Sequence, residues 1–171
     1  MLPYPQKGNY PEYYENYFRL IDPHKDLIQI MHEDAMQYKS VIESIPDQRL
    51  SYAYADGKWT AASLIQHIID TERIMTYRAL CIARGDKTPL HGFDENLYAA
   101  NTAVLHKPKA LLALEWFSVR QSTLSFYMGL SPDEMIKTGI ANNNLVSVAA
   151  NAYVTVGHAR HHFNVMKEKY L

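Results

Sequence analysis

Apolar residues recur with a helical period over four long stretches of the chain. The first predicted helix begins at Asp22, because Asp is a good N-cap residue and the following Pro23 costs little at the first helical position. It ends before Pro46, since proline disrupts the interior of a helix. The apolar positions of this stretch form one stripe that we expect to be buried: Leu27, Ile30, Met31, Tyr38, Val41, Ile42 and Ile45.

The second and third predicted helices are bounded by similar signals. The second follows Trp59, takes Thr60 as its N-cap and runs until Gly85, which can adopt the left-handed conformation that stops a helix. The third covers residues 108–128 and ends at Gly129.

A fourth long helix is predicted near the C-terminus, after a short helical turn at residues 131–134 (SPDE). It takes Ser147 as its N-cap and continues to Lys169. Gly157 lies in its interior, where glycine is unfavourable. This suggests close approach of another backbone or of a ligand, with a plain packing role as the alternative.

The segments between these helices predict loops, and none predicts a sheet. Residues 1–21 are rich in Tyr and Pro, and the spacing of the prolines excludes an early helix, so we expect a segment that covers the bundle. Residues 85–102 and 139–146 predict loops. The pattern therefore predicts one all-α domain over residues 1–171: a four-helix bundle with an irregular N-terminal segment and a long loop between helices two and three.

Composition and charge restrict the classes of function. With 47% apolar residues, 20% charged residues and a net charge of -1, the chain is typical of a globular protein and offers no basic face for nucleic acid. The single cysteine, Cys81, excludes an internal disulfide and suits a reducing, cytoplasmic location. The N-terminus has no apolar run like that of a signal peptide. Residues 138–157 lack charge but contain four asparagines, which argues against a membrane span.

Two histidines of the fourth helix form a candidate metal-binding pair. His158 and His162 are four residues apart, which places both imidazoles on one face of the helix, one turn apart. Their neighbours at helical spacing are mostly apolar, so the pair is expected to face inward. An HxxxH pair alone is weak support for a metal, because the chain has eight histidines and surface or core histidines are the alternative.

His67 is the natural third ligand. It interrupts the apolar stretch LIQHII of the second helix, where an unpartnered buried imidazole would be costly. Side chains from two adjacent helices can meet at one ion, since packed helix axes lie about 8–10 Å apart. A core histidine bonded to a backbone carbonyl is the alternative for this residue.

The residues around these histidines resemble the DinB-like superfamily, which also contains the YfiT-type proteins regarded as metal-dependent hydrolases. The resemblance rests on GKWTAASLIQHIIDTERIMTYRALCIARGDKTPLHGFDENLYA and on TVGHARHHFNVMKEKYL. It covers the chain from about Asp22 to the C-terminus. It implies a four-helix bundle, often a homodimer, that holds a metal on one histidine of helix two and two of helix four: His67, His158 and His162.

Three neutral nitrogen ligands leave room for water or substrate, which is typical of catalytic rather than structural zinc. Zinc, nickel and iron all accept imidazole ligands, so the ligand type does not identify the metal. A zinc-type ion can activate water, polarise a carbonyl or hold a thiolate. The superfamily includes transferases that use low-molecular-weight thiols, so the resemblance implies either a small-thiol transferase or a hydrolase acting on a small molecule.

The catalytic residues are less well defined. Asp70 and Glu72 lie in the DTER segment of the resemblance and are candidates for orienting a ligand or acting as a general base. The alternative is that they pair with Arg73 or with other basic residues. His161 lies about 100° around the helix from His162, so we interpret it as a packing or surface residue.

Loop residues are secondary candidates. The three asparagines at 142–144 either form a turn, which asparagine favours, or reach the open face of the site. His91 and Phe93 of the long loop are candidates for a substrate rim. The main functional alternative to an enzyme is a metal-binding stress-response protein without catalysis, and a nucleic-acid-binding module ranks third.

Overall fold

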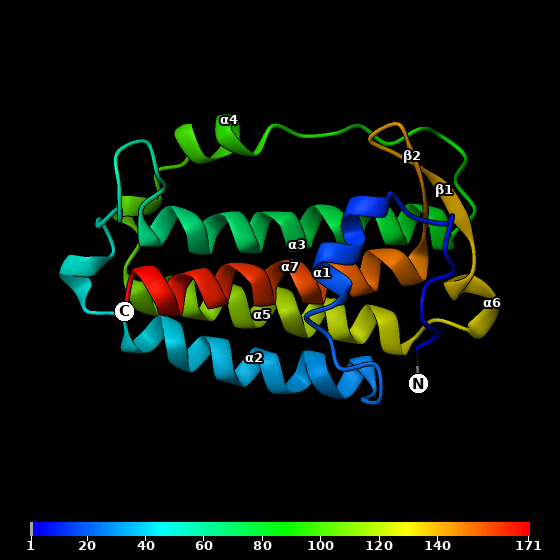
Figure 1. Ribbon diagram of the computed structural model, residues 1–171, viewed down its shortest axis with the longest axis horizontal. Coiled ribbons are helices and arrows are strands. Elements are labelled where there is room, and N and C mark those ends of the chain that lie inside the picture. The colour runs from blue at the N-terminus through cyan, green and yellow to red at the C-terminus, as the bar shows by residue number, and fades with distance from the viewer. Residues whose placement is uncertain (1) are drawn as a thin grey trace.

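The structure, a computed structural model, describes residues 2–171. Four long helices lie side by side in it (Figure 1). These are α2 (Leu27–Ser44), α3 (Ala61–Ala83), α5 (Lys109–Met128) and α7 (Val148–Lys169). α2 packs against α5, and α3 packs against both α5 and α7. The predicted four-helix bundle is confirmed.

The helix ends largely follow the predicted signals. The Thr60 hydroxyl accepts the backbone N–H of Ser63 at 3.1 Å and caps α3, and the Ser147 hydroxyl caps α7 in the same way. Gly85, just after α3, has a φ of 83°, so it supplies the left-handed stop. The predicted turn near residue 131 is α6 (Pro132–Met135), with a complete capping box.

The predicted start of the first long helix was wrong. The carboxylate of Asp22 accepts the N–H of His24 at 2.9 Å and closes a local turn, and α2 begins five residues later, at Leu27. Asp favours such turns as much as helix caps, which is why the sequence signal was ambiguous. A short 3-10 helix, η2 (Asp47–Arg49), follows α2.

The N-terminal segment is not wholly irregular, which corrects the prediction that its prolines exclude helix. After Pro11, the last proline of the segment, the chain forms η1 (Glu12–Tyr14) and α1 (Glu15–Phe18). α1 lies across α7 (Figure 1). Tyr14 and Phe18 are buried in the apolar cluster at this end of the bundle, so the segment seals one face of α7.

A β-hairpin precedes α7, where the sequence predicted only a loop. β1 (Thr138–Ala141) pairs antiparallel with β2 (Asn144–Ser147), with Ala141 opposite Asn144. The two residues between the strands, Asn142 and Asn143, have φ values of 48° and 61°. Positive φ at both positions is the geometry of a two-residue hairpin turn, which asparagine tolerates.

The connection between α3 and α5 runs back along the length of the bundle, so these two helices begin at the same end (Figure 1). It contains α4 (Glu95–Ala100) and η3 (Val104–His106), where the sequence predicted only loop. Asp94 caps α4 by accepting two backbone N–H groups. The connection passes over α3 and brings α4 to the face that carries His67.

The centre of the bundle contains aromatic rings and one ion pair. Tyr38 stacks on Phe163 with ring centroids 3.8 Å apart, and Trp116 donates its indole N–H to a backbone carbonyl of α2. Arg120 donates two hydrogen bonds to Glu72, and both side chains are almost fully buried. No helix of the described chain combines the length and the apolar character needed to cross a bilayer.

Candidate metal centre

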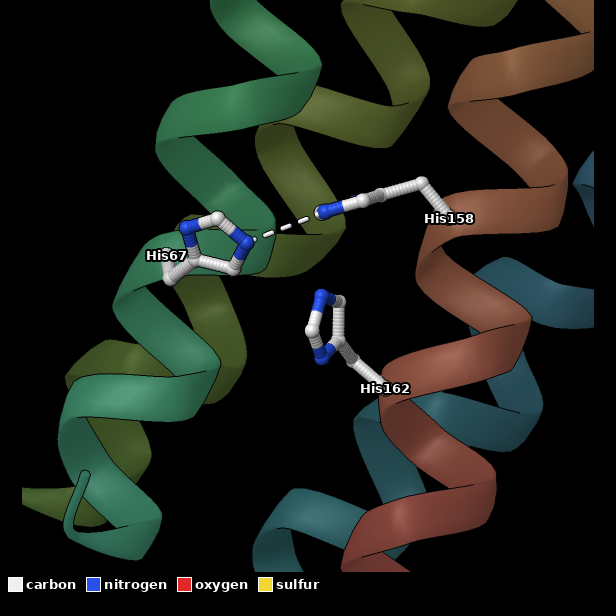
Figure 2. A group of neighbouring side chains, drawn as sticks. All are labelled: His67, His158 and His162. Carbon is white, nitrogen blue, oxygen red and sulfur yellow. Dashed lines mark hydrogen bonds between the residues drawn. The ribbon is translucent and has the colours of Figure 1, made fainter. Parts of the chain in front are cut away.

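Three histidines from two helices converge inside the bundle. His67 reaches from α3, and His158 and His162 reach from α7, toward one point (Figure 2). One nitrogen of each ring lies within 4.8 Å of the corresponding nitrogens of the other two, and the Nε2 atoms of His67 and His158 are 3.0 Å apart. The predicted convergence of these three residues is therefore present in the structure.

Local sequence and helix packing explain this geometry. The four-residue spacing of His158 and His162 places their rings on one face of α7, edge to face, with centroids 4.4 Å apart. α7 packs against α3, which carries His67 as one of its buried residues. Two aromatic rings border the cluster. The ring centroids of Trp59 and His67 are 4.6 Å apart, and those of Tyr17 and His158 are 5.7 Å apart.

Burial keeps all three imidazoles neutral near pH 7. Burial lowers the pKa of His67 to about 4 and that of His162 to about 3. Burial, together with the neighbouring histidines, holds the pKa of His158 well below its usual value. Neutral imidazoles present the lone pairs that a metal ion requires.

The cluster fits a divalent metal ion. Zinc-type bonds to nitrogen are about 2.0–2.1 Å long, so two nitrogens on one ion lie within roughly 4 Å of each other. The three rings are already close to that spacing. Within residues 2–171, no fourth His, Cys, Asp or Glu joins the group. The donor set is thus three neutral nitrogens, without a carboxylate or a thiolate.

The cluster faces a cavity of about 220 Å³. All three histidines contribute to its wall, so a bound ion would be accessible to a small molecule. The rest of the wall comes from the N-terminal segment, the end of the α2–α3 connection, α3, the α3–α5 connection, the hairpin and α7: Tyr13, Tyr14, Tyr17, Trp59, Thr71, Met75, Arg78, Phe93, Glu95, Asn142 and Val154.

The two charged residues of the described cavity wall were missed by the sequence analysis. Glu95, in the first turn of α4, is the only carboxylate among the described residues of the wall, and Arg78 is the only cation. Glu95 comes from a stretch predicted as loop, and nothing in its local sequence distinguishes it from a surface residue. Arg78 belongs to the same face of α3 as His67, a periodicity that could have revealed it.

The two carboxylates proposed from the sequence lie outside this cavity. Asp70 accepts hydrogen bonds from Gln66 at 2.9 Å and from Arg73 at 3.3 Å on the outer side of α3. Glu72 points into the bundle core, where Arg120 binds both of its oxygens. Asp70 thus forms the ion pair with Arg73 that the sequence offered as the alternative to a role in the site. The carboxylate of Glu72 is bound by Arg120.

Other predicted residues divide between the site and its surroundings. His161 lies outside the three-histidine group, borders Tyr17 and lines a second cavity of about 290 Å³ beside Trp59. Phe93 reaches the wall of the first cavity, as expected for a rim residue, whereas His91 contributes its carbonyl to a hydrogen bond. Asn142 both forms the hairpin turn and lines the cavity.

Comparison with known protein families identifies the family of this chain. The sequence model of the DinB superfamily matches residues 31–166, a span that includes all three histidines. This chain belongs to the DinB superfamily. The suspected resemblance is confirmed, and it covers most of the chain.

Two curated sequences similar to this DinB protein carry metal-related names. A protein of Oceanobacillus iheyensis named "Putative metal-dependent hydrolase" is 26% identical over 155 residues, which are 85% of this chain and 88% of the relative. A Geobacillus thermodenitrificans protein with the same description is 28% identical over 102 residues, 58% of this chain and 57% of the relative. Together with the histidine cluster, these names support a metal-binding DinB protein.

Solved structures confirm the bundle. YfiT from Bacillus subtilis, described as a probable metal-dependent hydrolase with an unusual four-helix bundle topology, superposes with a TM-score of 0.75 at 16% identity, covering 97% of this chain and 90% of YfiT. A DinB-like protein from Bacillus subtilis gives a TM-score of 0.60 at 17% identity, covering 84% and 88% of the two chains. At these identities the likeness establishes the fold.

Proposed function

We propose that this DinB protein is a metal-dependent hydrolase acting on a small molecule, with His67, His158 and His162 as the ligands of one divalent ion. The observation that carries the proposal is the open side of the histidine cluster: three neutral imidazoles face a cavity, and no fourth ligating side chain closes the group within residues 2–171. The names of the relatives support the same reaction class.

A bound divalent ion would polarise a substrate carbonyl and make water more acidic. The ion would be zinc, nickel or iron, since each accepts imidazole. The chain contributes groups that bind the substrate and move protons around this centre. Glu95 is the carboxylate that can accept a proton within the cavity. This assigns to Glu95 the role that the sequence had offered to Asp70 and Glu72.

The tyrosines of the N-terminal segment supply the complementary donors. Burial raises the pKa of the hydroxyls of both Tyr14 and Tyr17, and the nearby Glu95 raises that of Tyr17 further. Both hydroxyls therefore stay protonated near pH 7 and can donate hydrogen bonds to a substrate oxygen that becomes negative during the reaction. The aromatic wall around them limits access of bulk water to that oxygen.

Transfer of a small thiol is the second candidate. All three ligands are neutral, so the full positive charge of a divalent ion would remain available to an anionic thiolate. Cys81 does not line the cavity, so the thiol would come from a separate molecule. A DinB protein that binds metal without catalysis is the third possibility, which an activity measurement separates from the other two.

The test uses untagged protein loaded with zinc, nickel or iron and assayed against ester and amide substrates, then against electrophiles with common thiols. We expect turnover that a chelator removes, that His67→Ala abolishes and that Glu95→Gln lowers at least about 100-fold. Glu43→Gln, an exposed carboxylate on α2, is the matched control and leaves the rate unchanged. Absence of turnover with every metal, or full activity of His67→Ala, contradicts an enzymatic role.

A further inference from the structure

One face of α3 carries a row of side chains that begins at the histidine cluster and continues along the cavity wall. His67, Thr71, Met75 and Arg78 follow one another at spacings of four, four and three residues, which places them on the same side of the helix. All four line the cavity. The rise of a helix separates the α-carbons of His67 and Arg78 by about 16 Å, so the two ends of the row are about three turns apart.

Arg78 is a buried cation without a counter-charge. Its side chain belongs to a residue that is only 4% exposed, yet no carboxylate among the described residues lies within 4.0 Å of its guanidinium. Its polar contacts are neutral: the carbonyl oxygen of His91 at 2.7 Å and the sulfur of Met75 at 3.6 Å. The ring of Phe93 borders it with its centroid 6.0 Å away.

Two other arginines that enter the bundle each have a carboxylate partner. Arg120 binds both oxygens of Glu72 at 2.7 and 2.8 Å, and Arg160 binds both oxygens of Asp34 at 2.9 Å. A buried charge is costly unless it is paired, and a carboxylate partner meets that cost for both of these arginines. Arg78 is the exception, and it is the one that faces the cavity.

A second unsatisfied group lies between Arg78 and the histidines. The hydroxyl of Thr71 is buried, in a residue 2% exposed, and has no hydrogen-bond partner. Glu95, the single carboxylate among the described wall residues, is an exposed residue of α4 and does not pair with Arg78. The described wall thus offers a substrate the Arg78 cation and, between it and the histidines, the buried Thr71 hydroxyl without a partner.

We propose that the substrate carries a carboxylate or phosphate group that the Arg78 guanidinium binds, while its reacting group lies at the three histidines. This inference rests on the proposed function, because it takes the histidine cluster as the reacting end. The planar guanidinium matches such oxyanions with two parallel hydrogen bonds, and the bound anion replaces the missing counter-charge. The Thr71 hydroxyl bonds the connecting part of the same molecule.

The test measures binding at the metal without requiring turnover. Protein loaded with cobalt(II) is titrated with mercaptoalkanoates of increasing chain length, with mercaptoalkanols of the same lengths and with mercaptoalkylphosphonates. A thiolate that binds cobalt produces a charge-transfer absorption band, from which Kd follows. Arg78→Met is the test variant. Arg73→Met is the matched control, because Arg73 lies on α3 but pairs with Asp70 and Glu115 outside the cavity.

We expect that, at one chain length, an acidic thiol binds at least about tenfold more tightly than the alcohol of that length. The tighter binding of the acid persists in Arg73→Met and disappears in Arg78→Met. The affinity of Arg78→Met for the alcohol stays at the wild-type value, which shows that its cavity is intact. Arg78→Lys, which keeps the charge but not the planar fork, retains part of the advantage. Whichever of the two acidic series binds more tightly shows whether the anionic group that Arg78 binds is a carboxylate or a phosphate.

The contrary outcomes are distinct. If alcohol and acid bind equally at every length while the absorption band forms, the proposed metal site stands and the role of Arg78 is refuted. An acid advantage that survives in Arg78→Met refutes it as well. If no thiol produces the band in the wild-type protein, the open metal site of the proposed function fails, and the inference about Arg78 fails with it.

Discussion

The backbone of Tyr17 rests directly against Gly157, one residue before His158. A β-carbon at position 157 would lie 2.7 Å from the carbonyl carbon of Tyr17 and still closer to its oxygen. The glycine in the middle of α7 therefore allows α1 to cross the helix at close range and to place the Tyr17 ring beside the histidine cluster. The backbone approach suggested by this glycine in the sequence is confirmed.

The glycine contact predicts that Gly157→Ala destabilises the protein, although alanine is normally the better residue in a helix. The added methyl group must displace Tyr17, and such overpacking costs about 1–3 kcal/mol. Denaturant unfolding measures the loss, and limited proteolysis measures whether α1 detaches. Gly129→Ala is the control, because a β-carbon there would make only ordinary contacts at 3.5 Å. Equal or greater stability of Gly157→Ala would show that the contact is not restrictive.

The buried ion pair predicts a stability effect that is separate from the metal. Glu72→Gln leaves the Arg120 cation buried without its partner, so we expect the free energy of unfolding to fall by about 3–5 kcal/mol. Metal content, measured on the folded protein, stays at the wild-type level. Lys39→Met breaks the exposed pair with Glu43 and costs less than about 1 kcal/mol. A Glu72→Gln protein of unchanged stability would refute the structural role assigned to this carboxylate.

The buried histidines predict a pH dependence of the metal-free protein. The pKa of His67 is about 4 in the folded state, against an ordinary value of 6.5. Between these values the unfolded chain binds more protons than the folded one, so the free energy of unfolding falls as the pH is lowered from 6.5 toward 4. Each such histidine contributes a slope of about 1 kcal/mol per pH unit.

Denaturant unfolding of chelator-treated protein at several pH values tests this slope, with His67→Gln as the comparison. The variant lacks one of the shifted groups, so its stability declines less steeply between pH 6.5 and 4 than that of the wild type. Identical slopes for the two proteins would mean that His67 does not remain neutral in the folded state.

Much of the fold follows from local sequence. The caps at Thr60 and Ser147 and the stop at Gly85 are short-range signals, and they bound the two helices that carry the histidines. The hairpin had a signal that was not used: two asparagines flanked by short apolar stretches suit a two-residue turn with positive φ. Asp22 was misinterpreted because an aspartate that closes a turn and one that caps a helix have the same local sequence.

The site was predictable only in part. His67, His158 and His162 could be grouped because each lies on the inward face of a periodic helix, and the resemblance joined the two helices. Glu95 could not be predicted as a site residue, because it reaches the cavity only through the path of the α3–α5 connection along the bundle. No local sequence pattern indicates that path. Arg78 lies within a recognisable periodicity, but its lack of a partner is a property of the tertiary structure alone.

The most direct test of the account is the metal content of untagged protein, measured by elemental analysis. We expect one equivalent of a divalent metal per chain in the wild type and in His161→Ala, whose side chain lies outside the histidine cluster. His67→Ala, His158→Ala and His162→Ala should each lose most of it. A full equivalent in His67→Ala, or a loss in His161→Ala as large as in His162→Ala, would contradict the three-histidine site.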